Sequence, residues 1–212
     1  PDGAVGPVNG GTRAAVRHWS CMNMLTDSHD AVTADWAAAL LDFWFNQVGE
    51  SGWWSHDPAL DQRCLGDYQA LWREKQALPA ESFLDRADDA LAAVLLFDQL
   101  PRNMFRGTAQ AFDTDALARD IARGAIAQGY DIQIGGAGRL FFYMPFQHSE
   151  ALEDQDMAVT LIEGTGDADA IDFARQHHAM IQRFGRFPHR NAALGRETLP
   201  EEAEAVAEGS DW

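Results

Sequence analysis

The sequence predicts an all-α protein whose helices pack as antiparallel pairs. Apolar residues recur at helical spacing in segment after segment along the chain. Glycine, proline and capping residues punctuate these segments with short turns. No segment shows the clean alternation of apolar and polar residues that marks a β-strand. Consecutive helices joined by short turns favour antiparallel neighbours, as in helical-repeat folds.

Two helices are expected in the first third of the chain. The first is expected to begin at a cap on Thr33 or Asp35 and to end at the glycine-bounded turn 49–52. The second is expected to start at Asp57-Pro58, because proline is favoured at the first position of a helix.

Residues 87–100 are apolar on nearly every side, so they predict a central, buried helix. Asp98 and Gln99 interrupt the apolar pattern just before Pro101, where this helix is expected to stop. The next helix is expected to begin at a cap on Asp113 or Thr114, and Gly129 stands where a left-handed C-terminal cap is typical. Further helices are expected at about 139–148, 150–162, 169–184 and 200–208.

The bulk composition favours a single folded domain and excludes several classes of protein. With 212 residues, 46% of them hydrophobic, residues 31–212 can form one all-helical domain. The glycine-rich segment 1–30 has no apolar core of a secretion signal, and we expect it to be an extra tail without function. A net charge of -17 argues against binding to nucleic acid or to a membrane surface. Two isolated cysteines favour the cytoplasm, and nothing indicates the oligomeric state.

Three sequence blocks carry a resemblance to a known family. They are Leu95-Leu-Phe-Asp-Gln-Leu-Pro-Arg-Asn-Met-Phe-Arg-Gly107, continuing to Asp115; Arg139-Leu-Phe-Phe-Tyr-Met-Pro-Phe-Gln-His-Ser-Glu150, continuing to Gln155; and Arg183-Phe-Gly-Arg-Phe-Pro-His-Arg-Asn191, continuing to Glu197. From about residue 40 to the C-terminus, the chain resembles the bacterial domain-of-unknown-function-924 family. The resemblance implies a right-handed helical array similar to tetratricopeptide repeats, with no established activity.

Each block places polar residues at the end of an apolar helix, and in antiparallel pairs such ends can converge on one cleft. Arginines there offer planar forks for carboxylate or phosphate, which predicts a site for a small anionic metabolite or an acidic peptide end. The alternative is that these residues form ion pairs that only fix the packing of the helix ends. The expected ligand-binding residues are Asp98, Arg102, Asn103, Arg106, Arg183, Arg186, Arg190 and Asn191.

A second hypothesis places a hydrolase or lyase in the same cleft. His148 or His189 would transfer the proton, and Glu150 would orient the histidine. The sequence has no nucleophile elbow, phosphate loop or dinucleotide motif, so no cofactor is expected. The spacing of His148, Glu150 and Asp154 matches no zinc pattern, and no metal is expected.

A third hypothesis is a protein–protein adaptor that uses a concave helical surface. It predicts an open groove with exposed apolar anchors such as Trp53. Whether the protein is an enzyme at all is therefore left open by the sequence.

Overall fold

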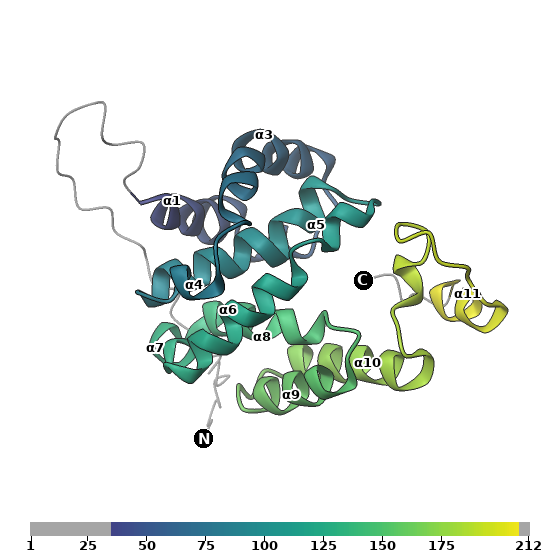
Figure 1. The fold of residues 1–212 in the computed structure, drawn as a ribbon. Helices are drawn as coiled ribbons and strands as arrows, with labels where there is room; N and C mark the ends of the chain where they lie inside the picture. Colours follow the sequence, from purple (N-terminus) through teal and green to yellow (C-terminus); the bar gives the residue numbers. More distant parts are fainter. Residues whose placement is uncertain (1–34, 208–212) are drawn as a thin grey trace, which may run out of the picture.

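The computed structural model describes residues 35–207, and in this part of the chain helix follows helix with no β-strand (Figure 1). The all-α prediction is therefore confirmed. The predicted tail of residues 1–30 lies outside the described residues. Within residues 35–207, no helix is both long enough and apolar enough to cross a membrane.

The α-helices are α1 (Trp36–Asp42), α2 (Glu50–Trp53), α3 (Pro58–Lys75), α4 (Ala87–Val94), α5 (Leu100–Met104), α6 (Asp115–Ala127), α7 (Tyr130–Ile134), α8 (Gly136–Gln147), α9 (Leu152–Glu163), α10 (Ala168–Phe184) and α11 (Pro200–Ala207). Two π-helical turns, Phe43–Val48 and Leu95–Gln99, extend α1 and join α4 to α5. Short 3-10 turns lie at Ala80–Phe83, Ala109–Phe112 and Pro188–Arg190.

The core lies along α4, which contacts α1 and α6. From Ala90 through Phe97 the chain is fully buried, as its uninterrupted apolar sequence predicts. Beyond α6 the array continues through α8 and α9 to α10, each packed on the one before. Figure 1 shows α11, with the chain leading to it, set to one side of this array beyond the end of α10.

Several predicted helix ends are confirmed by their geometry. The Asp35 carboxylate accepts from the amide of Ala38 at 3.1 Å, and the Asp57 carboxylate accepts from Ala59 at 2.8 Å. Gly129 adopts the left-handed conformation (φ 74°) that its position as a cap predicts. These local signals work because each satisfies a backbone group or a φ value that few residues satisfy.

One predicted boundary is wrong. The central helix does not stop before Pro101, because α5 carries it on to Met104. The π turn explains this continuation: the Leu100 amide bonds back to Leu95, five residues earlier, so the hydrogen-bond ladder is already shifted where proline lacks its N–H. The first helix does end at the predicted segment 49–52, since Gly49 (φ 67°) follows the last helical residue, Val48, but the short helix α2 begins at the next residue.

Candidate functional site

Asp98 lies in the π turn between α4 and α5, and its side chain is 0% exposed. Both carboxylate oxygens accept from His148 Nδ1, at 2.9 and 3.0 Å, and Gln99 Nε2 donates at 2.6 Å. Arg102 Nη1 lies 3.3 Å from Oδ1 of Asp98. Burial opposes ionisation, but the charge of Arg102 and the hydrogen bonds from His148 and Gln99 outweigh it, and the pKa of Asp98 falls well below its usual range. Asp98 is therefore a buried carboxylate held ionised by its neighbours.

Arg102 links two buried carboxylates. Its guanidinium donates to both oxygens of Asp115, at 3.0 and 3.1 Å, and also to the backbone carbonyl of Asp98. Burial alone would lower the pKa of Arg102, but Asp115 and Asp98 raise it above the ordinary value. Asp115 is the first residue of α6, so this Asp–Arg–Asp chain ties the central helix to the start of the next.

His148 is the C-cap of α8, and its ring is held at Nδ1. Because a carboxylate can only accept, the contact with Asp98 fixes the hydrogen of the neutral ring on Nδ1. Within residues 35–207, no group forms a hydrogen bond with Nε2, which is left with its lone pair. Burial and the charge of Arg102 lower the pKa of His148 in spite of Asp98.

Gln155, on α9, fixes the backbone around this histidine. Its amide nitrogen donates to the carbonyls of Gln147, at 2.7 Å, and Ser149, at 2.6 Å. These carbonyls belong to the residues immediately before and after His148. The position of the imidazole is thus set by its own hydrogen bond and by a clamp on its backbone.

His177, on α10, brings a second buried imidazole to the same region. Its ring centroid lies 6.4 Å from that of His148, and Nδ1 lies 2.9 Å from the carbonyl oxygen of Phe173. Burial, reinforced by the neighbouring His148, lowers the pKa of His177 to about 3. His177 is therefore neutral throughout the physiological range.

Arg190 completes the group from the 3-10 turn that follows α10. The guanidinium lies over the rings of Phe187, at 4.4 Å, and Phe112, at 4.7 Å. It is 6% exposed, its Nη1 is 3.7 Å from Asp115, and its Nε has no hydrogen-bond partner among the described residues. Burial and the nearby charge of Arg102 lower the pKa of Arg190 to about 10. We call Asp98, Arg102, Asp115, His148, His177 and Arg190 the central cluster.

Asn103 and Arg106, both predicted to bind ligand, lie in a different group. Asn103 Nδ2 donates to Asp61 of α3 at 2.9 Å, and Arg106 donates to both oxygens of that carboxylate at 2.8 Å. Both oxygens of the Asp61 carboxylate are thus engaged by donors from Asn103 and Arg106. The group attaches α5 to α3 and stands apart from the central cluster.

Glu150 does not contact His148, contrary to its predicted orienting role. Its carboxylate accepts two hydrogen bonds from Arg196, both at 2.8 Å, and one from the amide of Phe187 at 2.9 Å. Asp98 occupies the orienting position instead. Glu150 holds the chain beyond α10 against the helical array.

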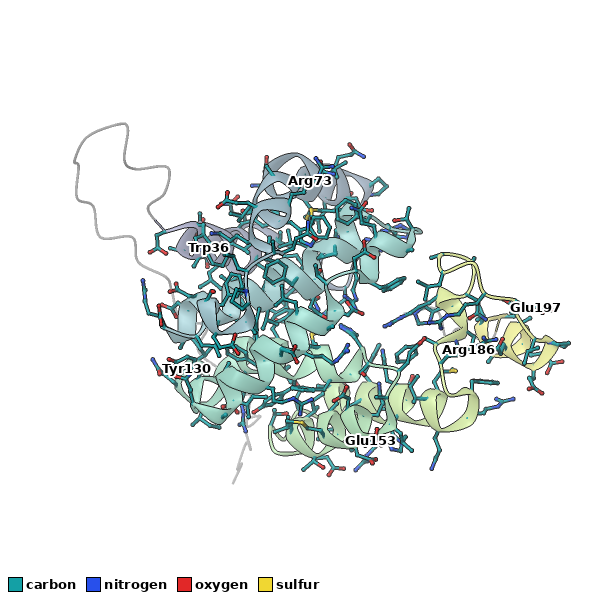
Figure 2. The ribbon with its side chains drawn as sticks, in the orientation of Figure 1. Trp36, Arg73, Tyr130, Glu153, Arg186 and Glu197 are labelled. Atoms are coloured by element: carbon teal, nitrogen blue, oxygen red, sulfur yellow. The ribbon has the colours of Figure 1, made fainter. Side chains whose placement is uncertain are left out.

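Arg186 and Asn191 serve the packing of a C-terminal unit, which we define as Arg186, Asn191 and residues 197–207. Arg186 donates to both oxygens of Glu202, at 2.6 and 2.9 Å, and to the carbonyl of Glu197 at 2.9 Å. Asn191 Nδ2 donates to Glu202 at 3.1 Å, and the amide of Leu199 does so at 2.8 Å. Figure 2 shows Arg186 and Glu197 in this unit, to one side of the main array.

The two remaining predicted residues also lie outside the central cluster. Arg183 is exposed, with its guanidinium 4.5 Å from the ring of Phe184. His189 is half-buried, and its ring packs against Phe187 at 5.5 Å. Of the residues that the sequence predicted to converge, the structure brings together Asp98, Arg102, His148 and Arg190. The others lie elsewhere.

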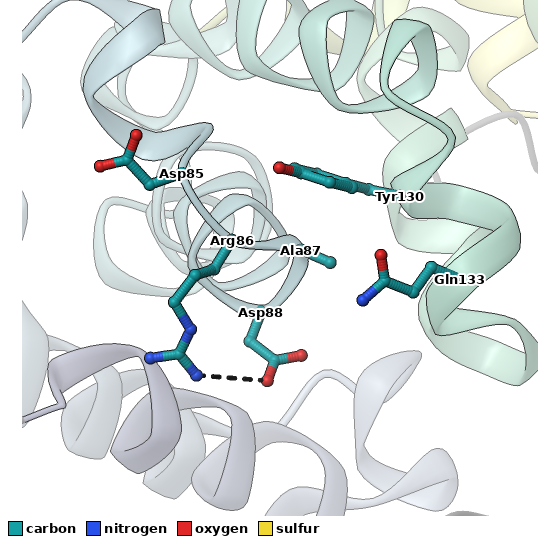
Figure 3. Close-up of a pocket in the computed structure, with 6 residues that line it drawn as sticks. All are labelled: Asp85, Arg86, Ala87, Asp88, Tyr130 and Gln133. Carbon is teal, nitrogen blue, oxygen red and sulfur yellow. Dashed lines mark ion pairs between the residues drawn. The ribbon is translucent and has the colours of Figure 1, made fainter.

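The surface pocket of Figure 3 holds none of the predicted residues. Its volume is about 280 Å³, and two of its lining residues, Arg86 and Asp88, form an ion pair of 3.7 Å. The lining residues are Asp85, Arg86, Ala87, Asp88, Tyr130 and Gln133. Among residues 35–207, no three His, Cys, Asp or Glu side chains are grouped to hold a metal ion.

Comparison with known proteins places the chain in a family. The family described as bacterial protein of unknown function (DUF924) matches residues 40–210. The chain belongs to the DUF924 family. A solved structure of a protein of unknown function from Agrobacterium tumefaciens is 39% identical, covering 84% of this chain and 99% of that one with a TM-score of 0.76. No curated protein matches.

In this DUF924 chain, sequence reasoning missed the site roles of Asp115, Gln155 and His177. Asp115 and Gln155 end two of the blocks that carry the family resemblance. The sequence thus marks both residues but does not indicate what they contact. His177 is distinguished from its neighbour His178 only by the structure, since His178 bonds to the exposed Asp156 at 2.8 Å.

Proposed function

We propose that this DUF924 protein binds a small anion at Arg190, through a carboxylate or phosphate group. The ligand is an anionic metabolite or the carboxylate of an acidic peptide end. One observation carries the proposal: a guanidinium that is 6% exposed has no hydrogen-bonded carboxylate of its own.

The contrast with Arg102 supports this interpretation. Arg102 binds both oxygens of Asp115 within 3.1 Å, so that carboxylate is already engaged when Arg190 approaches to 3.7 Å. Buried charged groups normally have hydrogen-bond partners, and a deficit at one of them favours a missing ligand.

The two aromatic rings support the same conclusion. Phe187 and Phe112 lie against the guanidinium of Arg190 and restrict its plane. The N–H groups project from the edge of that plane, in the fork that matches carboxylate or phosphate. Arg190 is thus oriented before any ligand arrives.

The test is thermal unfolding of the full chain with acetate, succinate, phosphate or sulfate, at constant ionic strength against sodium chloride. A binding anion at 100 times its dissociation constant adds about 2.7 kcal/mol to the free energy of unfolding. For a chain of this size, that free energy raises the Tm by roughly 5–10 °C. The Arg190→Gln variant should lose the increase, and Arg190→Lys should lose most of it because the fork is gone.

Arg183→Gln is the matched control, because it removes an exposed arginine near the same chain segment but outside the central cluster. It should respond to each anion as the wild type does. Equal Tm shifts in wild-type protein and Arg190→Gln would refute the proposal, as would the absence of any anion-specific shift.

A second candidate function, a hydrolase or lyase, is favoured by the contact between Asp98 and His148. The carboxylate holds Nδ1–H, so Nε2 can act as a general base beside a bound anion. Turnover of a metabolite mixture, followed by NMR, should then disappear in His148→Asn, and turnover that persists in this variant would exclude His148 as the base.

The adaptor hypothesis has less support. The indole of Trp53 donates to the Trp44 carbonyl at 2.8 Å, and its ring packs edge-on against Phe45 and Phe141. It is therefore held within the fold, and the neighbouring Trp54 is the exposed residue, at 62%.

A further inference from the structure

The central cluster contains a second group suited to an anion on Arg190. We infer that His148 is that second contact, and that the protein takes up one proton from solvent onto His148 Nε2 when the anion binds. This inference rests on the proposed function and adds the residue, the proton and the class of ligand.

Two independent sets of contacts place His148 and Arg190 around the same small region. Through polar groups, Arg102 touches Asp98, the partner of His148, and Asp115, the partner of Arg190. Both carboxylates therefore belong to one connected network.

Through rings, the connection runs by way of α10. His148 lies 6.4 Å from His177, which packs against Phe187 at 5.5 Å, and Phe187 lies beneath the guanidinium of Arg190. His148 and Arg190 are thus connected by a polar route and an aromatic route, and, besides burial, the charge of Arg190 is near enough to lower the pKa of His148. In the proposed complex, an anion on Arg190 also contacts Nε2 of His148.

Four elements around His148 contribute a charged or titratable group to its electrostatics. Asp98 faces it from the π turn, Arg102 from α5, His177 from α10 and Arg190 from the 3-10 turn. In the free protein, burial and the two arginines disfavour a third positive charge on the imidazole. Asp98 is already bonded to Nδ1 and would stabilise an imidazolium once that opposition is reduced.

Charge balance explains why a bound anion reduces the opposition to a positive charge on His148. Asp98 and Asp115 balance Arg102 and Arg190, so the cluster is neutral while both histidines are neutral. A bound monoanion brings the cluster to a charge of -1 and a dianion such as sulfate brings it to -2, and in both cases protonation of one histidine offsets one unit of that charge. His177 is unsuited to this role, because its pKa is about 3 and it is buried deeper in the packing of α10.

The two donors of this site define the class of ligand. Arg190 and the protonated Nε2 of His148 are two donors on different elements, so the ligand needs at least two acceptor oxygens on one charged group. Carboxylate and phosphate groups meet this requirement, and sulfate resembles phosphate. Chloride does not, and it should bind without taking up a proton.

The test is isothermal titration calorimetry of the full chain at pH 7 with sulfate, and separately with acetate as the carboxylate arm. Both anions are effectively free of proton exchange at this pH. The titration is repeated in buffers of equal ionic strength and different ionisation enthalpy. The binding enthalpy should change with the buffer by an amount that corresponds to about one proton taken up per anion, and affinity should rise up to about tenfold per unit decrease in pH.

His148→Asn keeps a donor for Asp98 and removes the titrating nitrogen, so it should bind sulfate more weakly and without proton uptake. His178→Gln is the matched control, since it removes a histidine of α10 that is paired with Asp156 and outside the cluster. Its proton uptake should equal that of the wild type. The ¹⁵N shift of His148 in the wild type gives a measurement that needs no variant: sulfate should move it from the neutral to the imidazolium value.

The outcomes separate this inference from the proposed function. If sulfate and acetate bind with buffer-independent enthalpies, or if proton uptake persists in His148→Asn, the role of His148 is refuted. The proposed binding of the anion by Arg190 is not affected by either result. If neither anion binds the wild type, both proposals fail together.

Discussion

The C-terminal unit and the central cluster each have a buried carboxylate bonded to an arginine, but they differ in how completely the charged groups are paired. Glu202 accepts from Arg186, Asn191 and the Leu199 amide, and its pKa falls to about 2, with the hydrogen bond from Arg186 as the largest cause. In the central cluster, Arg190 has only a 3.7 Å approach to a carboxylate that Arg102 already occupies.

The difference separates a polar network that builds structure from one that is short of a partner. A fully paired network fixes the packing of the segments it joins and offers little to a ligand. A network with one underused cation can gain free energy when an anion arrives, because the cost of burying that cation has already been met by the fold.

The largest test of this comparison is Arg102→Met, which removes the fully paired arginine of the central cluster. Two buried carboxylates, Asp98 and Asp115, would lose their shared partner, and the expected loss is about 3–5 kcal/mol in the free energy of unfolding. Urea unfolding followed by circular dichroism measures this. A loss below about 1 kcal/mol would show that the Asp–Arg–Asp chain is not the structural part of the cluster.

The second test uses acid. The pKa of His177 is lowered to about 3, so the folded state resists a proton that the unfolded chain accepts near pH 6.5. Its contribution is fully present above pH 6.5 and is lost as the pH falls toward 3, at up to about 1.4 kcal/mol per pH unit. Asp98 has a lowered pKa and loses its contribution only below about pH 4.

Urea unfolding of wild type and His177→Gln between pH 7 and pH 4.5 therefore measures the contribution of His177 to stability without that of Asp98. The variant should show a shallower fall in stability with pH than the wild type. Parallel curves would mean that His177 accepts a proton without disturbing the packing of α10.

The smallest expected effect is that of Arg190→Met in the absence of ligand. Methionine loses the contacts with Phe112 and Phe187 but removes an underused buried charge, and the net change should lie within about 1 kcal/mol. Arg186→Met is the matched variant in the C-terminal unit, and it should be the more destabilising of the two because it leaves Glu202 short of donors. The reverse ranking would remove the distinction between the two regions.

The sequence predicted the elements well wherever a local signal decided them. Asp35, Asp57 and Gly129 mark helix ends through their own backbone bonds or φ values, and the apolar run before Asp98 predicted the buried central helix. The continuation past Pro101 was missed, because a π turn depends on packing that no local pattern records.

The candidate site was predicted only in part for a related reason. The sequence identifies polar residues at helix ends but not the order in which they pair. Glu150 had the right charge and position to orient His148, yet Arg196 and the Phe187 amide engage it, and Asp98 is bonded to the imidazole instead. Pairing of this kind is decided by tertiary geometry across about 50 residues of chain, beyond the reach of helical periodicity.

The π turn at Leu95–Gln99 makes the cluster sensitive to the length of the chain itself. A π turn contains one residue more than the α-helical path it replaces, and an α-helix rotates by about 100° per residue. Deleting one residue here would relax the helix to ordinary geometry and rotate α5 relative to α4 and to α6, which packs on α4. Arg102 would then point away from Asp115, so a change that preserves the helix and its composition would still dismantle the network.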